Sequence, residues 1–296
     1  MMLYGQGLFP MKLEDTAWFV VKVAAVLVLW RSAGVRADCP AACSCEAGTV
    51  SCENKGLTVV PPLPPDTSTL QLQGNRITGL KELTSQQLPN LEAIDLSGNN
   101  LTALTGREFA AFSSLTRLVL SGNKISDLPR DGFAGPTSLL YLYLDGNLLT
   151  SMGDDRFFTL QSLALLHLQN NRISAVSDYA VAGLTNLKDL ALSNNTLSEV
   201  SRVGFRSLVG LKRLLLDGNR LQSFAEGTFA SMQNLEYLDL ADNSFSSVEG
   251  SQFSGLSQLQ EIRLDRNGLA DLRSDVFRSL QVHLLGSTSL RGSLGK

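Results

Sequence analysis

Residues 139–152 read LLYLYLDGNLLTSM, which combines alternating leucines with a turn that closes at an asparagine. Leu142 and Leu144 fall on one face of a strand, because successive side chains of a strand point to opposite faces. Tyr141 and Tyr143 therefore point the other way. The stretch raises the question of why two neighbouring aromatic rings lie opposite the core.

The same pattern recurs with a fixed period of 24 residues along most of the chain. Each unit matches L-x-x-L-x-L-x-x-N-x-L-x-x-L. The asparagine recurs nine times, as Asn75, Asn99, Asn123, Asn147, Asn171, Asn195, Asn219, Asn243 and Asn267. A period of this length indicates a solenoid, in which each unit buries its leucines against the units on either side.

Each unit is expected to begin with a short strand, such as residues 190–192, and to return through an outer arm. Ten residues after most of the asparagines this arm carries a phenylalanine, which Ser85 and Val181 replace in two units. Buried in its turn, each asparagine can donate to and accept from backbone groups, so that stacked asparagines form a ladder. The pattern predicts an α/β solenoid with a curved parallel sheet on its concave face. Its convex side is expected to be irregular, 3-10 or short-helical.

The amino-terminal region predicts entry into the secretory pathway. Residues 17–30 read AWFVVKVAAVLVLW, and residues 35–37 read VRA, which is typical of a cleavage site after small residues. We therefore expect a signal peptide over residues 1–37, with Met1 or Met11 as its start. An uncleaved membrane anchor is the alternative, although this apolar run is shorter than the roughly 20 residues that span a bilayer.

All four cysteines follow that segment closely, as Cys39, Cys43, Cys45 and Cys52. An even number of cysteines behind a secretory signal predicts two disulfides. A zinc site is the alternative for four cysteines. The single residue between Cys43 and Cys45, together with the oxidising route, favours disulfides. The spacing alone leaves three pairings open.

These features resemble extracellular leucine-rich repeat proteins with a cysteine-rich amino-terminal cap. The spacing C-x3-C-x-C-x6-C and the stretch LPPDTSTLQLQGNRIT over residues 63–78 are similar to the start of decorin-type small leucine-rich proteoglycans. Slit proteins and the Nogo receptor have related caps. The resemblance implies a cap over residues 38–66, with Cys39 paired to Cys45 and Cys43 paired to Cys52. Nine repeats follow over residues 67–282.

Residues 283–296 depart from the repeat. A tenth unit would place leucines at 283, 286 and 288 and an asparagine at 291, but none of these positions carries them. We expect an irregular tail without a cysteine-rich carboxy-terminal cap. It arises either by truncation of a longer chain or as a cap built on its own leucines.

The side chains between the leucines predict a binding surface on the concave face. Tyr141 and Tyr143 lie there with apolar and charged neighbours, which is typical of protein interfaces. The predicted ligand-binding residues are Arg117, Val119, Tyr141, Tyr143, Asp145, Leu165, His167, Asp189 and Arg213. The alternative is that tyrosine merely suits a strand and covers the sheet.

Other surface features carry weaker predictions. Asp217, Asp239, Glu261 and Asp265 form an acidic group that Arg263 and Arg266 interrupt, so we expect a solvated face rather than a calcium site. Two sequons predict glycosylation, at Asn100, expected to be exposed, and at Asn194, expected near the concave rim.

The sequence favours protein recognition over catalysis. It holds two histidines and no phosphate loop, catalytic nucleophile motif or metal-ligand spacing. We expect no enzyme activity, no cofactor and no small-molecule substrate. The net charge of -3, without a basic run, argues against nucleic acid. The resemblance implies a secreted scaffold that binds a matrix protein, growth factor or cell-surface receptor. The alternative is a truncated ectodomain of a single-pass membrane receptor.

Overall fold

The computed structural model describes residues 38–269. The predicted signal peptide and the predicted tail over residues 283–296 lie outside that range. Residues 39–269 belong to one compact unit. Within residues 38–269 no helix is long and apolar enough to cross a membrane.

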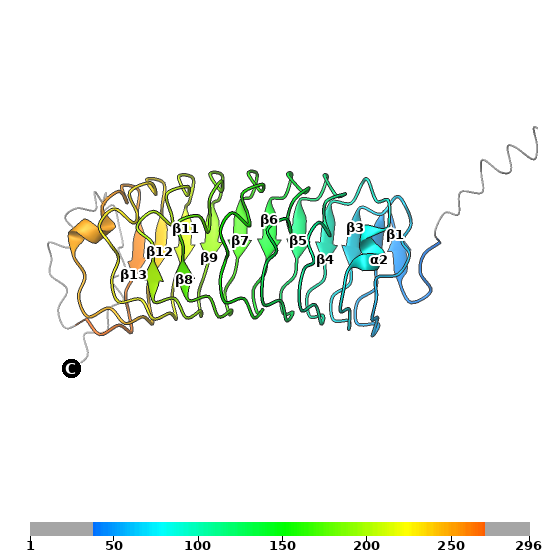
Figure 1. Ribbon diagram of the computed structural model, residues 1–296, viewed down its shortest axis with the longest axis horizontal. Coiled ribbons are helices and arrows are strands. Elements are labelled where there is room, and N and C mark those ends of the chain that lie inside the picture. Colours follow the sequence, from blue (N-terminus) through cyan, green and yellow to red (C-terminus); the bar gives the residue numbers. More distant parts are fainter. Residues whose placement is uncertain (1–37, 270–296) are drawn as a thin grey trace, which may run out of the picture. The chain divides into compact units, whose positions relative to one another are not determined.

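A single sheet of eleven strands runs along this unit, and Figure 1 shows the strands side by side in chain order. Its strands are β1 (Ser44–Glu46), β2 (Thr49–Ser51), β3 (Thr69–Gln71), β4 (Ala93–Asp95), β5 (Arg117–Val119), β6 (Tyr141–Tyr143), β7 (Leu165–His167), β9 (Asp189–Ala191), β11 (Arg213–Leu215), β12 (Tyr237–Asp239) and β13 (Glu261–Arg263). The cap contributes β1 and β2, which pair antiparallel, and all later neighbours pair parallel. The nine parallel repeats that the period predicts are therefore joined by two further strands.

Strand register follows the sequence period without slippage. Leu142 pairs with Leu118 on one side and with Leu166 on the other, each one period away. We number the coils from one, which contains Asn75, to nine, which contains Asn267. The strand of the sixth coil begins at Asp189, one residue earlier than the sequence predicts.

The outer arms, which run from each asparagine turn to the next strand, contain little helix. They hold α2 (Lys81–Thr84) and the 3-10 helix η1 (Gly250–Phe253). A second sheet, not predicted from the sequence, pairs β8 (Ala175–Val176) with β10 (Glu199–Val200) in parallel. These arms give the chain its irregular side.

The core consists of stacked leucines and a column of phenylalanines. Phe109, Phe133 and Phe157 stack with ring centroids 6.4 and 5.8 Å apart. Phe205, Phe229 and Phe253 form a second stack with spacings of 6.5 and 6.3 Å. Val181, which is fully buried, separates the two stacks, so the column is interrupted at the fifth coil.

The asparagine ladder joins every coil to the one before it. Asn171 Nδ2 donates to the carbonyl of Leu144 in the preceding coil at 3.0 Å and to Leu168 in its own coil at 2.9 Å. Its Oδ1 accepts from the amide of Leu149 at 3.0 Å. The same set of contacts recurs at each asparagine from Asn75 to Asn267, so the ladder satisfies backbone groups that the turn would otherwise leave unpaired.

The cap closes the first coil. Disulfides join Cys39 to Cys45 and Cys43 to Cys52, which is the pairing that the resemblance implies. Val50 of β2 is buried and pairs with Leu70 of the first repeat. The cap thus continues the sheet by one parallel strand and covers leucines that a terminal repeat would expose.

Candidate functional site

The concave face presents three columns of side chains, which lie six, four and two residues before each ladder asparagine. Parallel pairing aligns each column across the coils. Arg117 lies beside Tyr141, and Val119 lies beside Tyr143, which in turn neighbours His167. The nine residues predicted as a binding surface therefore come from five adjacent strands, β5, β6, β7, β9 and β11, and their turns.

The two tyrosines differ in what they offer to a partner. Tyr141 is 39% exposed, which makes it a large apolar residue at the surface of the sheet. Tyr143 is half-buried, and Val119 beside it is only 8% exposed. Little of Val119 is accessible beside the larger Tyr143 of the next strand, so its part in binding stays a prediction.

A chain of contacts runs from Arg117 through Tyr143 to His167. The guanidinium carbon of Arg117 lies 4.7 Å from the centroid of the Tyr143 ring, and Arg117 Nη1 donates to Tyr143 Oη at 3.3 Å. The Tyr143 and His167 rings meet edge to face with centroids 5.2 Å apart. These contacts hold Tyr143 in one orientation, while Arg117 remains exposed for a partner.

Asp189 continues this chain towards the later coils. His167 Nε2 lies 3.6 Å from Asp189 Oδ1, and Arg213 Nη1 lies 3.8 Å from Asp189 Oδ2. Asp189 Oδ1 is buried, and no hydrogen bond reaches it from any residue between 38 and 269. Both distances exceed those of a strong charge-assisted hydrogen bond, so this carboxylate is only loosely neutralised.

A second and tighter cluster surrounds Asp239 at β12 and β13. Arg263 Nη1 lies 2.9 Å from Asp239 Oδ2, and Tyr237 Oη donates to the same oxygen at 3.1 Å. Arg263 also reaches Asp265 at 3.3 Å. Burial raises the pKa of Tyr237, and the hydrogen bond with Tyr237 together with the two carboxylates raises the pKa of Arg263.

Within the acidic group predicted as a solvated face, Asp217, Glu261 and Asp265 are half-buried, and Asp239 is more deeply buried. Asp239 is 4% exposed and belongs to the buried part of the sheet. At the turn beyond it, Arg266 pairs with Asp242 at 2.5 Å, and this hydrogen bond lowers the pKa of the Asp242 carboxyl. The difference from the expectation is that Asp239 and Asp265 both form ion pairs with Arg263 on the sheet.

Some contacts within the third column were not predicted. Ser121 donates to Asp145 at 2.6 Å, and Ser193 donates to Asp217 at 2.5 Å. Both pairs combine residues one period apart, two positions before a ladder asparagine. A search for hydroxyl and carboxylate residues at a separation of 24 would have found them.

The two sequons occupy different environments. Asn194 is exposed in the turn that follows β9, with a positive φ of 53° that asparagine tolerates. Asn100 is only half-buried rather than fully exposed, and its amide donates to the Ile77 carbonyl at 2.9 Å. Glycosylation of Asn100 and of Asn194 remains a prediction.

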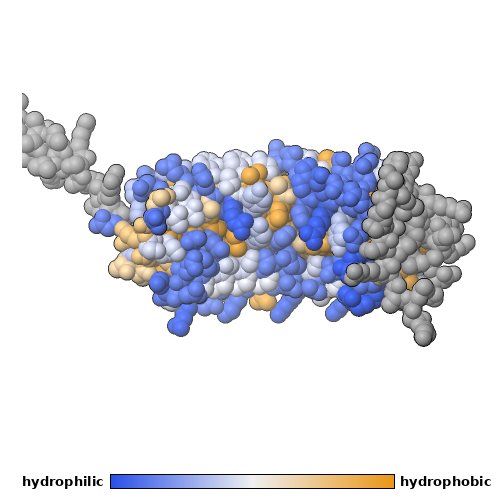
Figure 2. Space-filling view, turned by 180° about the vertical axis from the view of Figure 1, so that it is seen from behind, coloured by the Kyte–Doolittle hydropathy of each residue, from blue (hydrophilic) through white to orange (hydrophobic). Residues whose placement is uncertain are grey.

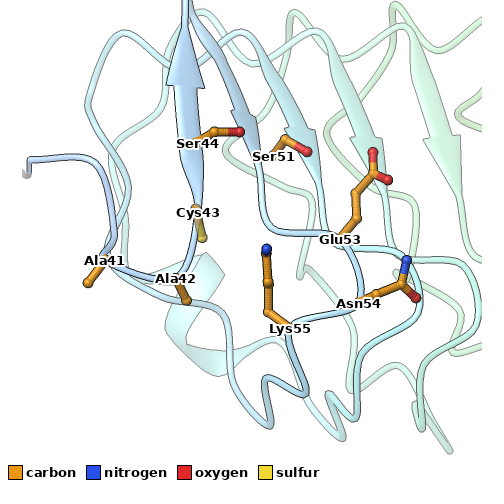
Figure 3. A pocket seen from close by; sticks show the side chains of 8 residues that line it. All are labelled: Ala41, Ala42, Cys43, Ser44, Ser51, Glu53, Asn54 and Lys55. Carbon is orange, nitrogen blue, oxygen red and sulfur yellow. The ribbon is translucent and has the colours of Figure 1, made fainter.

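A hollow of about 470 Å³ lies on the cap, away from the concave residues just described. Figure 3 shows Lys55 pointing into it. Its remaining walls are Ala41, Ala42, Cys43, Ser44, Ser51, Glu53 and Asn54. Because Cys43 is held in a disulfide, the hollow presents no thiol nucleophile.

The exposed surface has no extended apolar patch on the face drawn in Figure 2, where hydrophobic residues form a broken band between hydrophilic ones. Over residues 38–269 the large exposed apolar side chains are Val59, Tyr141, Phe158, Tyr179 and Val209. Of these, Tyr141 alone lies on the concave face. The arrangement suits recognition through a few anchored rings and surrounding charges.

The comparison with known families agrees with the repeats and the cap described above. Four overlapping matches to the leucine rich repeat family cover residues 65–125, 113–173, 161–221 and 209–269. The chain belongs to the leucine-rich repeat family. The leucine rich repeat N-terminal domain matches residues 38–65, which hold both disulfides. In this leucine-rich repeat protein, both the cap and the repeats therefore match known family models.

Decorins are among its relatives. The chain is 37% identical to horse (Equus caballus) decorin over 89 residues, which is 30% of this chain and 25% of that protein. It is 46% identical to human decorin over 56 residues, or 19% of this chain and 16% of decorin. The leucine-rich repeat chain therefore spans about a quarter of the length of the curated relatives it matches.

Solved structures share the solenoid over more of the chain. A chain of the TLR13–ssRNA13 complex superposes with a TM-score of 0.68 at 28% identity, covering 72% of this chain and 31% of that one. A chain of the octameric complex of Latrophilin 3, Unc5D and FLRT2 gives a TM-score of 0.66 at 27% identity, covering 82% of both chains. These similarities support a scaffold for macromolecular recognition.

Proposed function

We propose that this protein is a secreted scaffold that recognises a protein ligand through the concave face. The observation that carries the proposal is the exposed Tyr141 next to Tyr143, whose ring Arg117 and His167 hold in place. Tyrosine and arginine dominate interface hot spots, because they combine large contact area with polar tips. A matrix protein, a growth factor or a cell-surface receptor is the expected kind of ligand.

Two observations support recognition rather than catalysis. The polar groups of the concave face bind one another, in the order arginine, tyrosine, histidine, aspartate and arginine, rather than surrounding an enclosed cavity. Relatives of the same fold are found in named complexes, including one with Latrophilin 3 and Unc5D. Secretion is supported by the cap disulfides, which form in oxidising compartments.

A second candidate is the ligand-binding ectodomain of a single-pass adhesion or signalling receptor. The equal coverage of 82% with a chain of the FLRT2 complex favours it. Both candidates use the same concave face. They differ in whether the chain acts in solution or attached to a cell.

The test is a binding screen of the full chain, made through the secretory pathway, against an array of extracellular proteins. A captured partner is then measured against the double variant Tyr141→Ala and Tyr143→Ala. We expect its affinity to fall by about 2–4 kcal/mol, as hot-spot truncations do. Tyr179→Ala is the matched control, because Tyr179 is 46% exposed but lies on an outer arm.

An unchanged affinity in the double variant, with the control also unchanged, would reject the concave site. Comparable losses in both would place the contact on the outer arms. A partner released with the chain into the medium supports the secreted scaffold. Retention of the native chain on the cell surface supports the receptor.

A further inference from the structure

The residue that follows each ladder asparagine forms a separate surface, here called the turn edge. Its amide donates to the residue two positions beyond the asparagine of the preceding coil, as in Lys124 to Leu101 and Arg172 to Leu149, both at 2.8 Å. This backbone ladder fixes one turn-edge residue per coil in register. From the first coil to the seventh the turn edge reads Arg76, Asn100, Lys124, Leu148, Arg172, Thr196 and Arg220.

A cation occupies every second position of this row. Arg76, Lys124, Arg172 and Arg220 are all exposed, and within residues 38–269 none of them forms an ion pair. Parallel strands lie about 4.8 Å apart, so successive cations recur at roughly 10 Å. Four free positive charges in one line contrast with a net charge of -3 for the chain.

The columns on either side of the row contain no acidic residue over these seven coils. The position before each ladder asparagine holds glycine or asparagine, from Gly74 to Gly218. The position three after it is exposed and carries a hydroxyl or amide, in Thr78, Thr102, Ser126, Thr150, Ser174, Ser198 and Gln222. Asp127 and Glu199 lie one residue farther along. The turn edge is thus a cationic strip lined by hydrogen-bond donors. Asn100 lies in this row, so the strip is continuous in the chain that carries no glycan at this predicted glycosylation site.

We propose that the turn edge binds a linear sulfated polysaccharide. Sulfate groups along such a polymer accept hydrogen bonds from guanidinium, ammonium and hydroxyl donors, and a line of cations matches a line of anions better than a compact ligand. The surface is distinct from the concave face. The proposal rests on the proposed secretion only to bring the chain into contact with such a polymer.

The chemistry of the strip argues against nucleic acid as the ligand. Proteins that bind single strands stack bases on aromatic side chains, and the three columns hold no aromatic residue from Gly74 to Gln222. The strip therefore offers the ligand a row of charges but no surface on which bases could stack.

The test measures binding of the full chain to immobilised heparin at physiological salt, with single-stranded RNA as a competitor. The variant Arg76→Ser, Lys124→Ser, Arg172→Ser and Arg220→Ser removes the row. The matched control, Lys81→Ser, Arg130→Ser, Arg202→Ser and Arg206→Ser, removes the same charge from exposed residues elsewhere. We expect the row variant to lose affinity by at least about tenfold, with a shallower salt dependence, and the control to lose less than about threefold.

A variant that adds a positive charge to the row provides a second measurement, because it should raise heparin affinity rather than lower it. Leu148 is the half-buried gap between Lys124 and Arg172, so Leu148→Lys is expected to raise heparin affinity several-fold. Equal losses in row and control variants, together with no gain from Leu148→Lys, would overturn the proposal. Absence of heparin binding by the parent would also overturn it. Stronger competition by RNA than by free heparin would show that the strip is a nucleic-acid site instead. Because the concave face is not altered, its partner affinity separates this result from the proposed function.

Discussion

Two clusters on the concave face, one near its middle and one at β12 and β13, place the same residue types in different surroundings. At the fourth coil Arg117 lies over Tyr143 without an ion pair among residues 38–269, and Tyr141 beside it is 39% exposed. At β12 and β13, Tyr237 and Arg263 both contact Asp239, which is 4% exposed. A buried carboxylate decides the difference, because it binds the tyrosine and the arginine that would otherwise be available to a partner. The proposed recognition therefore concerns the first cluster, and we expect the second to contribute mainly to stability.

The ladder should behave alike beside both clusters, and it provides the largest expected effect on stability. Asn171→Ala removes the contacts with Leu144, Leu168 and Leu149 and is expected to reduce the free energy of unfolding by about 1–3 kcal/mol. Asn219→Ala should cost a similar amount. Chemical denaturation of both variants measures this, with the exposed Asn186→Ala as a control. An unshifted midpoint for Asn171→Ala would count against the ladder.

The buried carboxylate distinguishes the two clusters most directly. Asp239→Asn retains an acceptor for the Ala241 amide but loses the charge that faces Arg263. We expect the free energy of unfolding to fall by about 1–2 kcal/mol, because hydrogen bonds to charged groups are the stronger ones. Affinity for a captured partner should not change. A loss of affinity without a loss of stability would show that the later cluster also takes part in recognition.

The opposite pattern is expected for the first cluster. Arg117→Ala removes an exposed guanidinium and should weaken partner binding by about 1 kcal/mol or more, with little change in thermal stability. Arg206→Ala is the matched control, since Arg206 lies 5.3 Å from the Tyr179 ring centroid on an outer arm. If the two variants bind the partner equally well, Arg117 only positions the Tyr143 ring.

Alkaline pH gives the smallest expected effect and concerns Tyr237 alone. Burial raises its pKa in the folded state. A tyrosine whose folded pKa is raised contributes stability below its unfolded pKa of about 10, and this contribution is lost as pH rises through the folded value. The denaturation midpoint should therefore decrease as the pH rises above about 10. The decrease should be less steep in Tyr237→Phe than in the parent. Parallel curves for the two proteins would contradict this assignment.

The fold could be read from the sequence because a period of 24 residues leaves little freedom. Once the leucines of one coil are placed, register fixes those of the next, as Leu118, Leu142 and Leu166 illustrate. The paired strands β8 and β10 escaped prediction, since their two residues each carry no alternation that could be recognised.

The site was less predictable, because exposure depends on neighbouring side chains rather than on position in the repeat. Val119 and Asp239 occupy the same column as Tyr143, yet both are buried. The sequence places all three on the sheet face, with Val119 beside Tyr143, but it does not show how far each side chain is covered or that Arg263 pairs with Asp239. Columns follow from the period, whereas contacts between columns require side-chain orientations.

The interruption of the phenylalanine column at Val181 has a consequence for how the molecule opens. Each coil is stabilised mainly by its contacts with the two neighbouring coils. In the fifth coil the smaller Val181 takes the place of a phenylalanine between Phe157 and Phe205. The outer core therefore lacks a ring contact near the middle of the repeats, where the short β8–β10 pair joins the fifth and sixth coils. Amide hydrogen exchange should divide there into two cooperative blocks. A pulling force applied to the carboxy-terminal coils would then unfold them while the block that contains the cap stays folded.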